Sequence, residues 1–207
     1  MRQARIGHRF QHIVHRFALE RVDRVLIERS DEDDTGRGFD ALCDLNAVLD
    51  DTVKLLGDRF LREVQLTLER ASDLPEVPCS KDLVQQVLLN LIFNAAESMT
   101  NRKQIILATR QIDKLPASLV LAPASATRYA AISVRDFGSG ISPENLPRIF
   151  EPFFTTKALS VRRGTGLGLS MVYELAKKME AGLAVDSVLD QGSTFTLILP
   201  VRDSSTS

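Results

Sequence analysis

The segment from Ser80 to Met99 constrains the fold of this 207-residue chain more than any other stretch. Four polar side chains in it are spaced by four, four and three positions, so a helix places them along one stripe: Gln86, Asn90, Asn94 and Glu97. The other faces are apolar, as Val84, Val87, Leu88, Leu91, Ile92 and Ala95 show. Such a helix must be buried, and its amides must either satisfy one another and the backbone or bind a ligand. The pattern predicts a buried helix, packed on a sheet, with one polar seam.

The rest of the sequence beyond Gly57 mixes strand and helix patterns. Alternating apolar residues predict strands at 63–69, 104–110, 128–136, 182–188 and 193–200, the last two forming a hairpin around 189–192. Helical spacing predicts a helix from Leu167 to Glu180, and Ser142 followed by Pro143 predicts the N-terminus of a short helix through Phe150. Residues 115–126 read as an Ala/Pro-rich loop. We expect an α+β fold, a two-layer sandwich with a mostly antiparallel sheet.

The N-terminal part of the chain has a different pattern. Apolar residues at helical spacing predict helices over 6–28 and 39–56, joined by an acidic, Gly-containing loop. Two such helices form a hairpin with too little core of its own, so we expect it to dimerise into a four-helix bundle. The expected domains are a helical hairpin at 1–57 and a second domain at 58–207.

Composition excludes several classes of function. The chain has a net charge of −1, with 44% hydrophobic and 26% charged residues. It therefore lacks the positive charge expected of a general nucleic-acid binder or of a basic membrane-surface protein. The longest apolar run, near residues 84–96, is interrupted by amides, and the N-terminus lacks the apolar core of a signal peptide. Cys43 and Cys79 have no metal-type spacing, which favours a reduced, cytoplasmic setting.

Two glycine-rich segments suggest a ligand. In "RDFGSGI", Asp136 ends a predicted strand before Gly138 and Gly140; a carboxylate there can accept a hydrogen bond from an exocyclic amine. In "RRGTGLGLS", three glycines precede a predicted helix, whose N-terminus suits phosphate, and the cations Lys157, Arg162 and Arg163 precede them. Each segment alone is also compatible with a plain turn. Neither the P-loop pattern nor the dinucleotide fingerprint is present.

The order of these segments resembles the ATP-binding (Bergerat-type) domain of sensor histidine kinases, in the superfamily with gyrase, Hsp90 and MutL. "NLIFNAAESM" resembles the N box, "DFGSGI" the first glycine box, "FEPFFTTK" the F box, "GTGLGLS" the second glycine box and "GSTFTLILP" the terminal signature. The resemblance covers about residues 45–201.

The resemblance implies roles for individual positions. Asn94 is expected to ligate Mg²⁺ between the phosphates with help from Asn90, and Asp136 to hold the adenine amine with support from Ser193 through water. Gly138 and Gly140 would shape the base pocket. The phosphates would be bound by residues of the second glycine box and of a lid at about 156–163: Lys157, Arg162, Arg163, Gly164, Thr165, Gly166, Leu167 and Gly168.

The resemblance also bears on the reaction. ATP-hydrolysing relatives carry Glu four residues before the Mg²⁺-binding Asn, where this chain has Asn90, an amide without useful basicity. A site without a water-activating base favours phosphoryl transfer to a protein side chain over hydrolysis.

The N-terminal stretch "ARIGHRFQHIVHRF" loosely resembles a phosphoacceptor box, with His8 as the candidate acceptor. Arg9 departs from the pattern, since an acidic residue is expected there to assist proton removal from the imidazole. His12 and His15 share a helix face with His8, and simple solvation explains them equally well.

Together these features predict a protein histidine kinase of a two-component system that uses ATP and Mg²⁺, dimerises through its hairpin and phosphorylates a response regulator. Arg9 keeps two alternatives open. One is an ATP-binding, kinase-like adaptor; the other is a histidine phosphotransferase without autokinase activity.

Overall fold

The computed structural model describes residues 41–100, 103–155 and 166–202, and the elements below belong to them. The helices are α2 (Leu45–Glu63), α3 (Lys81–Ser98), α4 (Gly168–Lys178) and the 3₁₀ helix η1 (Leu146–Arg148). The strands are β1 (Leu42–Cys43), β2 (Val64–Glu69), β3 (Val77–Pro78), β4 (Lys103–Ile112), β5 (Leu119–Leu121), β6 (Tyr129–Asp136), β7 (Gly182–Val188) and β8 (Gly192–Pro200).

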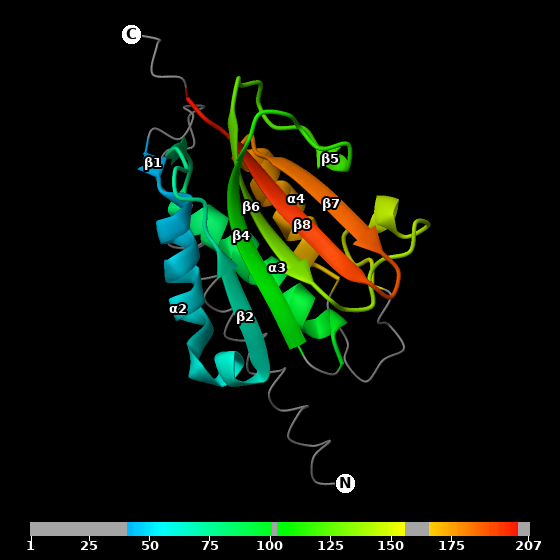
Figure 1. Ribbon diagram of the computed structural model, residues 1–207. Coiled ribbons are helices and arrows are strands. Elements are labelled where there is room, and N and C mark those ends of the chain that lie inside the picture. Colours follow the sequence, from blue (N-terminus) through cyan, green and yellow to red (C-terminus); the bar gives the residue numbers. More distant parts are fainter. Residues whose placement is uncertain (1–40, 101–102, 156–165, 203–207) are drawn as a thin grey trace, which may run out of the picture. The chain divides into compact units, whose positions relative to one another are not determined.

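Six of the strands form one mixed sheet in the order β2-β4-β6-β8-β7-β5. Strand β2 is parallel to β4, and the other neighbours are antiparallel. Helices α3 and α4 lie side by side on one face of this sheet (Figure 1). The expected α/β sandwich is therefore confirmed, as is the hairpin that joins β7 to β8.

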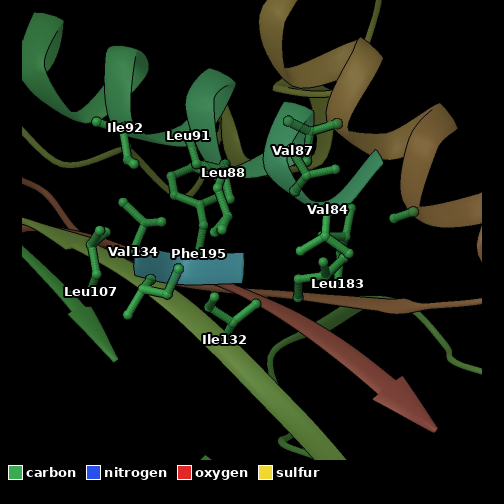
Figure 2. Close-up of a cluster of buried hydrophobic side chains, with 14 of the residues drawn as sticks. Val84, Val87, Leu88, Leu91, Ile92, Leu107, Ile132, Val134, Leu183 and Phe195 are labelled. Atoms are coloured by element: carbon green, nitrogen blue, oxygen red, sulfur yellow. The ribbon is translucent and has the colours of Figure 1, made fainter. Parts of the chain in front are cut away.

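Helix α3 supplies the centre of the core. The Ser80 side chain caps its N-terminus by accepting a hydrogen bond from the Leu83 N–H, at the residue where the sequence placed the start of this helix. In Figure 2, Leu88, Leu91 and Ile92 project from α3 toward the sheet. The strand side chains that they meet, all buried, come from β4, β6, β7 and β8: Leu107, Ile132, Val134, Leu183 and Phe195. The described helices include none that is both long and apolar enough to cross a membrane.

The other face of the sheet carries a smaller apolar cluster. Ala131 and Ile198, which are paired across β6 and β8, are buried there with Leu119 and Ala126 packed against their cluster. Leu119 belongs to β5, which pairs with β7. The sequence-based assignment of 115–126 as a plain loop was therefore incomplete, because a three-residue strand is too short to show a period.

The helix expected over 39–56 differs at both ends. Leu42 and Cys43 form β1 and pair with β3, and the Asp44 side chain caps α2 by accepting the Asn46 N–H at 2.8 Å. The helix then continues across a kink at Gly57 (φ 73°) to Glu63. Four α2 residues lie in the core shared with the sheet: Leu45, Val48, Leu49 and Phe60. The expected hairpin helix at 6–28 and its dimer lie outside the described residues.

The short helix expected from Pro143 through Phe150 is only the single 3₁₀ turn η1. The Ser142 carbonyl, rather than its side chain, accepts hydrogen bonds from the Asn145 and Leu146 N–H groups. The expected length was wrong because Pro147 inside the segment supplies no N–H to continue a helical ladder.

The packing of the core predicts how strongly two leucine substitutions lower the free energy of unfolding. Leu88→Ala removes a fully buried side chain under the sheet and should lower the free energy of unfolding by about 2–5 kcal/mol. Leu55→Ala is the matched control, because Leu55 in α2 is 44% exposed and its loss should cost less than about 1 kcal/mol. Urea unfolding of both variants measures the two values; equal losses would contradict the assigned core.

A second prediction concerns pH. Asp51 in α2 accepts hydrogen bonds from Lys54 at 2.8 Å and from Lys81, the first residue of α3, at 2.5 Å, and these cations lower its pKa from 3.8 to about 2. A lowered carboxyl pKa stabilises the fold above pH 3.8 and loses that effect as pH falls toward 2. Asp51→Asn should therefore lower the urea midpoint slightly at pH 7, and its difference from the unsubstituted chain should shrink as the pH falls from 4 to 2. A difference that is constant with pH would refute the assignment.

Candidate functional site

The amide stripe of α3 faces α4. The Gln86 side chain donates through Nε2 to the Met171 sulfur at 3.3 Å, and Asn90 Nδ2 donates to the Gln86 carbonyl at 2.9 Å. Asn90 Nδ2 also lies 3.9 Å from the same sulfur. Since these contacts occupy the amide nitrogen, the Asn90 oxygen is directed elsewhere: a Cβ placed on Gly168 would lie 3.6 Å from Oδ1. The Asn90 carbonyl oxygen therefore lies beside the start of α4.

The N-terminus of α4 is built on glycine. Gly168 is the first helical residue, and no side chain caps the helix at Leu167. Gly166 has φ +68°, and a Cβ there would come within 2.6 Å of the Phe153 backbone, whose N–H donates to the Gly166 carbonyl at 3.0 Å. Phe153 itself has φ 65° and a 73% exposed side chain. The glycine turn and the F box are thus clamped together by backbone contact.

Asp136, at the end of β6, is the buried carboxylate of the site, with only 3% of its surface exposed. Its Oδ1 accepts hydrogen bonds from the Gly138 N–H at 2.8 Å and the Ser98 hydroxyl at 3.1 Å. A Cβ on Gly138 would lie 2.0 Å from Ser98 Oγ, so only glycine fits there. A fixed acceptor buried at a strand end has the chemistry needed to bind a ligand amine.

Ser193 lies at the start of β8, which pairs with the end of β6. It follows Gly192, where a Cβ would come within 2.1 Å of the Asp136 carbonyl oxygen. The buried Ser193 hydroxyl is 2.9 Å from the hydroxyl of Ser187, which also accepts the Ile141 N–H at 2.9 Å. The β7–β8 hairpin is thereby joined to the loop of the first glycine box. No sequence pattern selects Ser187, because its contact with Ile141 spans 46 positions of the chain.

Gly140 has the other constrained backbone of this loop. Its φ is +63°, and a Cβ would come within 2.0 Å of the Val188 carbonyl oxygen. Glycine is therefore required at this position for two reasons, its left-handed backbone conformation and its close contact with the β7–β8 turn.

Ser98 is the site residue that the sequence interpretation missed. The stripe drawn through Gln86, Asn90 and Asn94 was completed with Glu97, although continued spacing of four leads to Ser98. The structure places the Ser98 hydroxyl against Asp136. The signal was present in the spacing, but a serine near a helix end is commonplace.

Several expected site residues lie outside the described part of the chain. These are His8, Lys157, Arg162, Arg163, Gly164 and Thr165. Their roles remain predictions, as does the expected lid.

A magnesium ion would have few protein ligands here. Asn90 and the half-buried Asn94 offer amide oxygens, which are hard donors that suit Mg²⁺. Within the described ranges, no group of three or more His, Cys, Asp or Glu side chains could hold a metal. The donor set therefore fits an ion that takes most of its ligands from phosphates and water.

Comparisons with known proteins agree with this geometry. Residues 79–203 match the family model "Histidine kinase-, DNA gyrase B-, and HSP90-like ATPase". The chain is 39% identical over 158 residues to the sensor kinase CckA of Brucella abortus and 36% identical over 160 residues to the sensor histidine kinase ZraS of Escherichia coli K12. These alignments cover 76% and 77% of this chain but only 16% and 30% of those proteins.

Solved structures show the same fold. The mycobacterial sensor histidine kinase MprB matches with a TM-score of 0.61 at 23% identity, covering 78% of this chain and 97% of that structure. Full-length ShkA, solved in complex with AMPPNP, matches with a TM-score of 0.62 at 25% identity, covering 80% of this chain and 32% of that one.

The contacts of Gly166 and Gly168 predict different losses of stability when each glycine is replaced by alanine. Gly166→Ala should lower the free energy of unfolding by about 1–3 kcal/mol, because it combines positive φ with a clash against the Phe153 backbone. Gly168→Ala should cause no loss, since its Cβ would make only an ordinary contact with Asn90. Urea unfolding of the two variants tests this; an unaffected Gly166→Ala protein would show that the clamp is absent in solution.

Proposed function

Because the chain belongs to the histidine kinase-, DNA gyrase B- and HSP90-like ATPase family, we propose that it acts as an ATP-dependent protein histidine kinase of a two-component system. The chain spans less than a third of the length of the curated relatives CckA and ZraS. The proposal therefore concerns the catalytic part of such a protein and names its substrate and partners by inference.

One observation carries the proposal. Asp136 is held at the last turn of α3, and Asn90 Oδ1 faces the start of α4 from two turns earlier on the same helix. Ser98 lies eight positions after Asn90, which corresponds to about 12 Å along the helix. A buried acceptor for a nucleobase amine at one end, and amide oxygens beside a glycine-rich helix N-terminus at the other, suit the two ends of ATP.

The proposed contacts with ATP follow from this placement. Asp136 binds the adenine amine, supported by Ser193, while Gly138 and Gly140 shape the base pocket. Gly166, Leu167 and Gly168 approach the phosphates with their backbone. The residues outside the described ranges that would complete the phosphate site and lid are Lys157, Arg162, Arg163, Gly164 and Thr165.

Magnesium is proposed to bind together with the nucleotide. Asn94, with Asn90 beside it, would hold the ion, which supplies charge neutralisation for the phosphates when bound. ShkA, one of the structural relatives, was solved in complex with AMPPNP, which supports nucleotide binding by this fold.

The reaction is proposed to be phosphoryl transfer to a protein side chain. Asn90 occupies the position where a hydrolytic relative would carry a general base, and its amide has no basicity. Its nitrogen donates to the Gln86 carbonyl. Transfer of the γ-phosphoryl then needs positioning and charge stabilisation, with His8 as the proposed acceptor.

The remaining parts of the proposal concern the partners. A homodimer through the N-terminal hairpin would present His8 to the nucleotide site, and a cytoplasmic response regulator would receive the phosphoryl group on an aspartate. Neither nucleic acid nor a membrane surface is needed as a partner.

Arg9 favours a second candidate function. A cation next to His8 cannot assist removal of the imidazole proton, as a carboxylate would. The same nucleotide site would then serve an adaptor that binds ATP as a conformational effector. A phosphotransferase whose histidine is phosphorylated by another protein is the other alternative, and the nucleotide motifs count against it because such a protein does not need them.

Phosphorylation of the full chain separates these candidates. The protein and its His8→Ala variant would be incubated with γ-labelled ATP and Mg²⁺, with His12→Ala and His15→Ala as matched controls. We expect an acid-labile, alkali-stable label that is lost in His8→Ala and retained in the two controls.

Other outcomes have distinct meanings. ATP binding without any label would remove autokinase activity and leave the adaptor or the phosphotransferase. A label that is lost in His12→Ala or His15→Ala, but kept in His8→Ala, would identify that other histidine as the phosphoacceptor. Absence of ATP binding would overturn the nucleotide site itself.

A further inference from the structure

Ser98 is placed where α3 meets the loop of the first glycine box. It is the last residue of α3, and its backbone carbonyl accepts the Ser139 N–H at 3.3 Å. Gly138 approaches so closely that a Cβ there would lie 2.7 Å from Ser98 Cβ. Both the backbone and the side chain of Ser98 therefore touch the loop that follows Asp136.

The Ser98 hydroxyl has one proton and two acceptors within reach. The Ala95 carbonyl oxygen is 2.8 Å away, and Asp136 Oδ1 is 3.1 Å away. The two acceptors compete for this proton, and a hydrogen bond to an ionised Asp136 carboxylate is the stronger type of interaction. Forming this hydrogen bond costs little side-chain entropy, because the helix already fixes the Ser98 side chain beside its acceptor.

Two donors converge on the same oxygen of Asp136. The Gly138 N–H reaches Oδ1 from the glycine loop, and Ser98 reaches it from α3. Donors on two separate elements restrict the rotation of the carboxylate before any ligand arrives. A preorganised acceptor loses less conformational freedom on binding and discriminates better between ligands.

Ser98 also continues the stripe of Asn90 and Asn94 with a spacing of four. The helix that holds the amides is thus connected through a side chain to the carboxylate at the base-binding end. This connection fixes the position of Asp136 relative to Asn90 and Asn94.

We propose that Ser98 is a positioning residue that sets the preference for adenine, by orienting the Asp136 carboxylate toward the exocyclic amine of the nucleotide. The inference rests on the proposed function, because it takes Asp136 as the group that reads the base. It predicts that removing the hydroxyl weakens recognition of the amine and leaves binding of the phosphates unchanged.

The test compares two nucleotides on matched variants of the full chain. Affinities for ATP and for inosine triphosphate, which has a carbonyl oxygen in place of the amine, are measured with Mg²⁺ by calorimetry. Ser98→Ala should weaken ATP binding about fivefold, as expected for the loss of one such hydrogen bond, and change the affinity for inosine triphosphate less than twofold. Ser139→Ala removes a hydroxyl that contacts the Gly140 carbonyl instead and should change neither.

Ser98→Cys keeps the shape and a weak donor, so its preference for ATP should lie between those of the unsubstituted protein and Ser98→Ala. If Ser98→Ala lowers the midpoint temperature of unfolding, the two nucleotide affinities are compared on Ser98→Cys instead. Equal weakening of both nucleotides in a folded Ser98 variant would overturn the proposal, because it would indicate a structural role only. So would unchanged ATP binding, or an unsubstituted protein that binds both nucleotides equally.

Failure of the underlying function has a different signature. If the unsubstituted protein binds neither nucleotide, the ATP site itself is wrong. If it prefers ATP and Ser98→Ala keeps that preference in full, the ATP site is supported and the proposed role of Ser98 is refuted.

Discussion

Helix α3 packs its apolar side chains against the sheet, and the site depends on that contact. Leu88, Leu91 and Ile92 are almost fully buried, so the rotation of the helix about its axis is fixed by the core. That rotation directs Asn90 toward α4 and Ser98 toward Asp136. A small change in this packing would displace both ends of the site together, which explains how a single helix can hold Asn90 and the serine that contacts Asp136 in register.

The glycines show how close the surrounding segments must come. Gly138 faces Ser98, Gly140 faces the Val188 carbonyl, and Gly166 faces the Phe153 backbone, each at a distance that excludes a Cβ. These contacts join the first glycine box to α3 and to the β7–β8 turn, and the second glycine box to the F box. The glycine pattern therefore reflects packing between loops, and the proposed nucleotide would restrict the same positions further.

The sequence predicted the elements with a clear period and missed those without one. The polar stripe within an apolar helical pattern and the apolar runs at 104–110 and 128–136 were sufficient for α3 and the central strands. Strand β5 has three residues, and β1 pairs only through Leu42 and Cys43, so neither leaves a pattern to recognise. The start of α2 was misplaced for the same reason: an apolar residue such as Leu42 suits a strand or a helix, and its pairing with β3 decides between them.

The sequence alone determined the family-like order of motifs, the amide stripe and Asp136, because residue type and spacing carry that information. The tertiary structure decided which hydroxyl reaches Asp136, which atom of the Asn90 side-chain amide faces Gly168, and which serines link β7 to β8. Ser98 and Asp136 are separated by 38 positions, and their contact exists only because the sheet and α3 pack together. Local patterns specify elements, whereas hydrogen bonds between distant elements arise from the packing that brings those elements together.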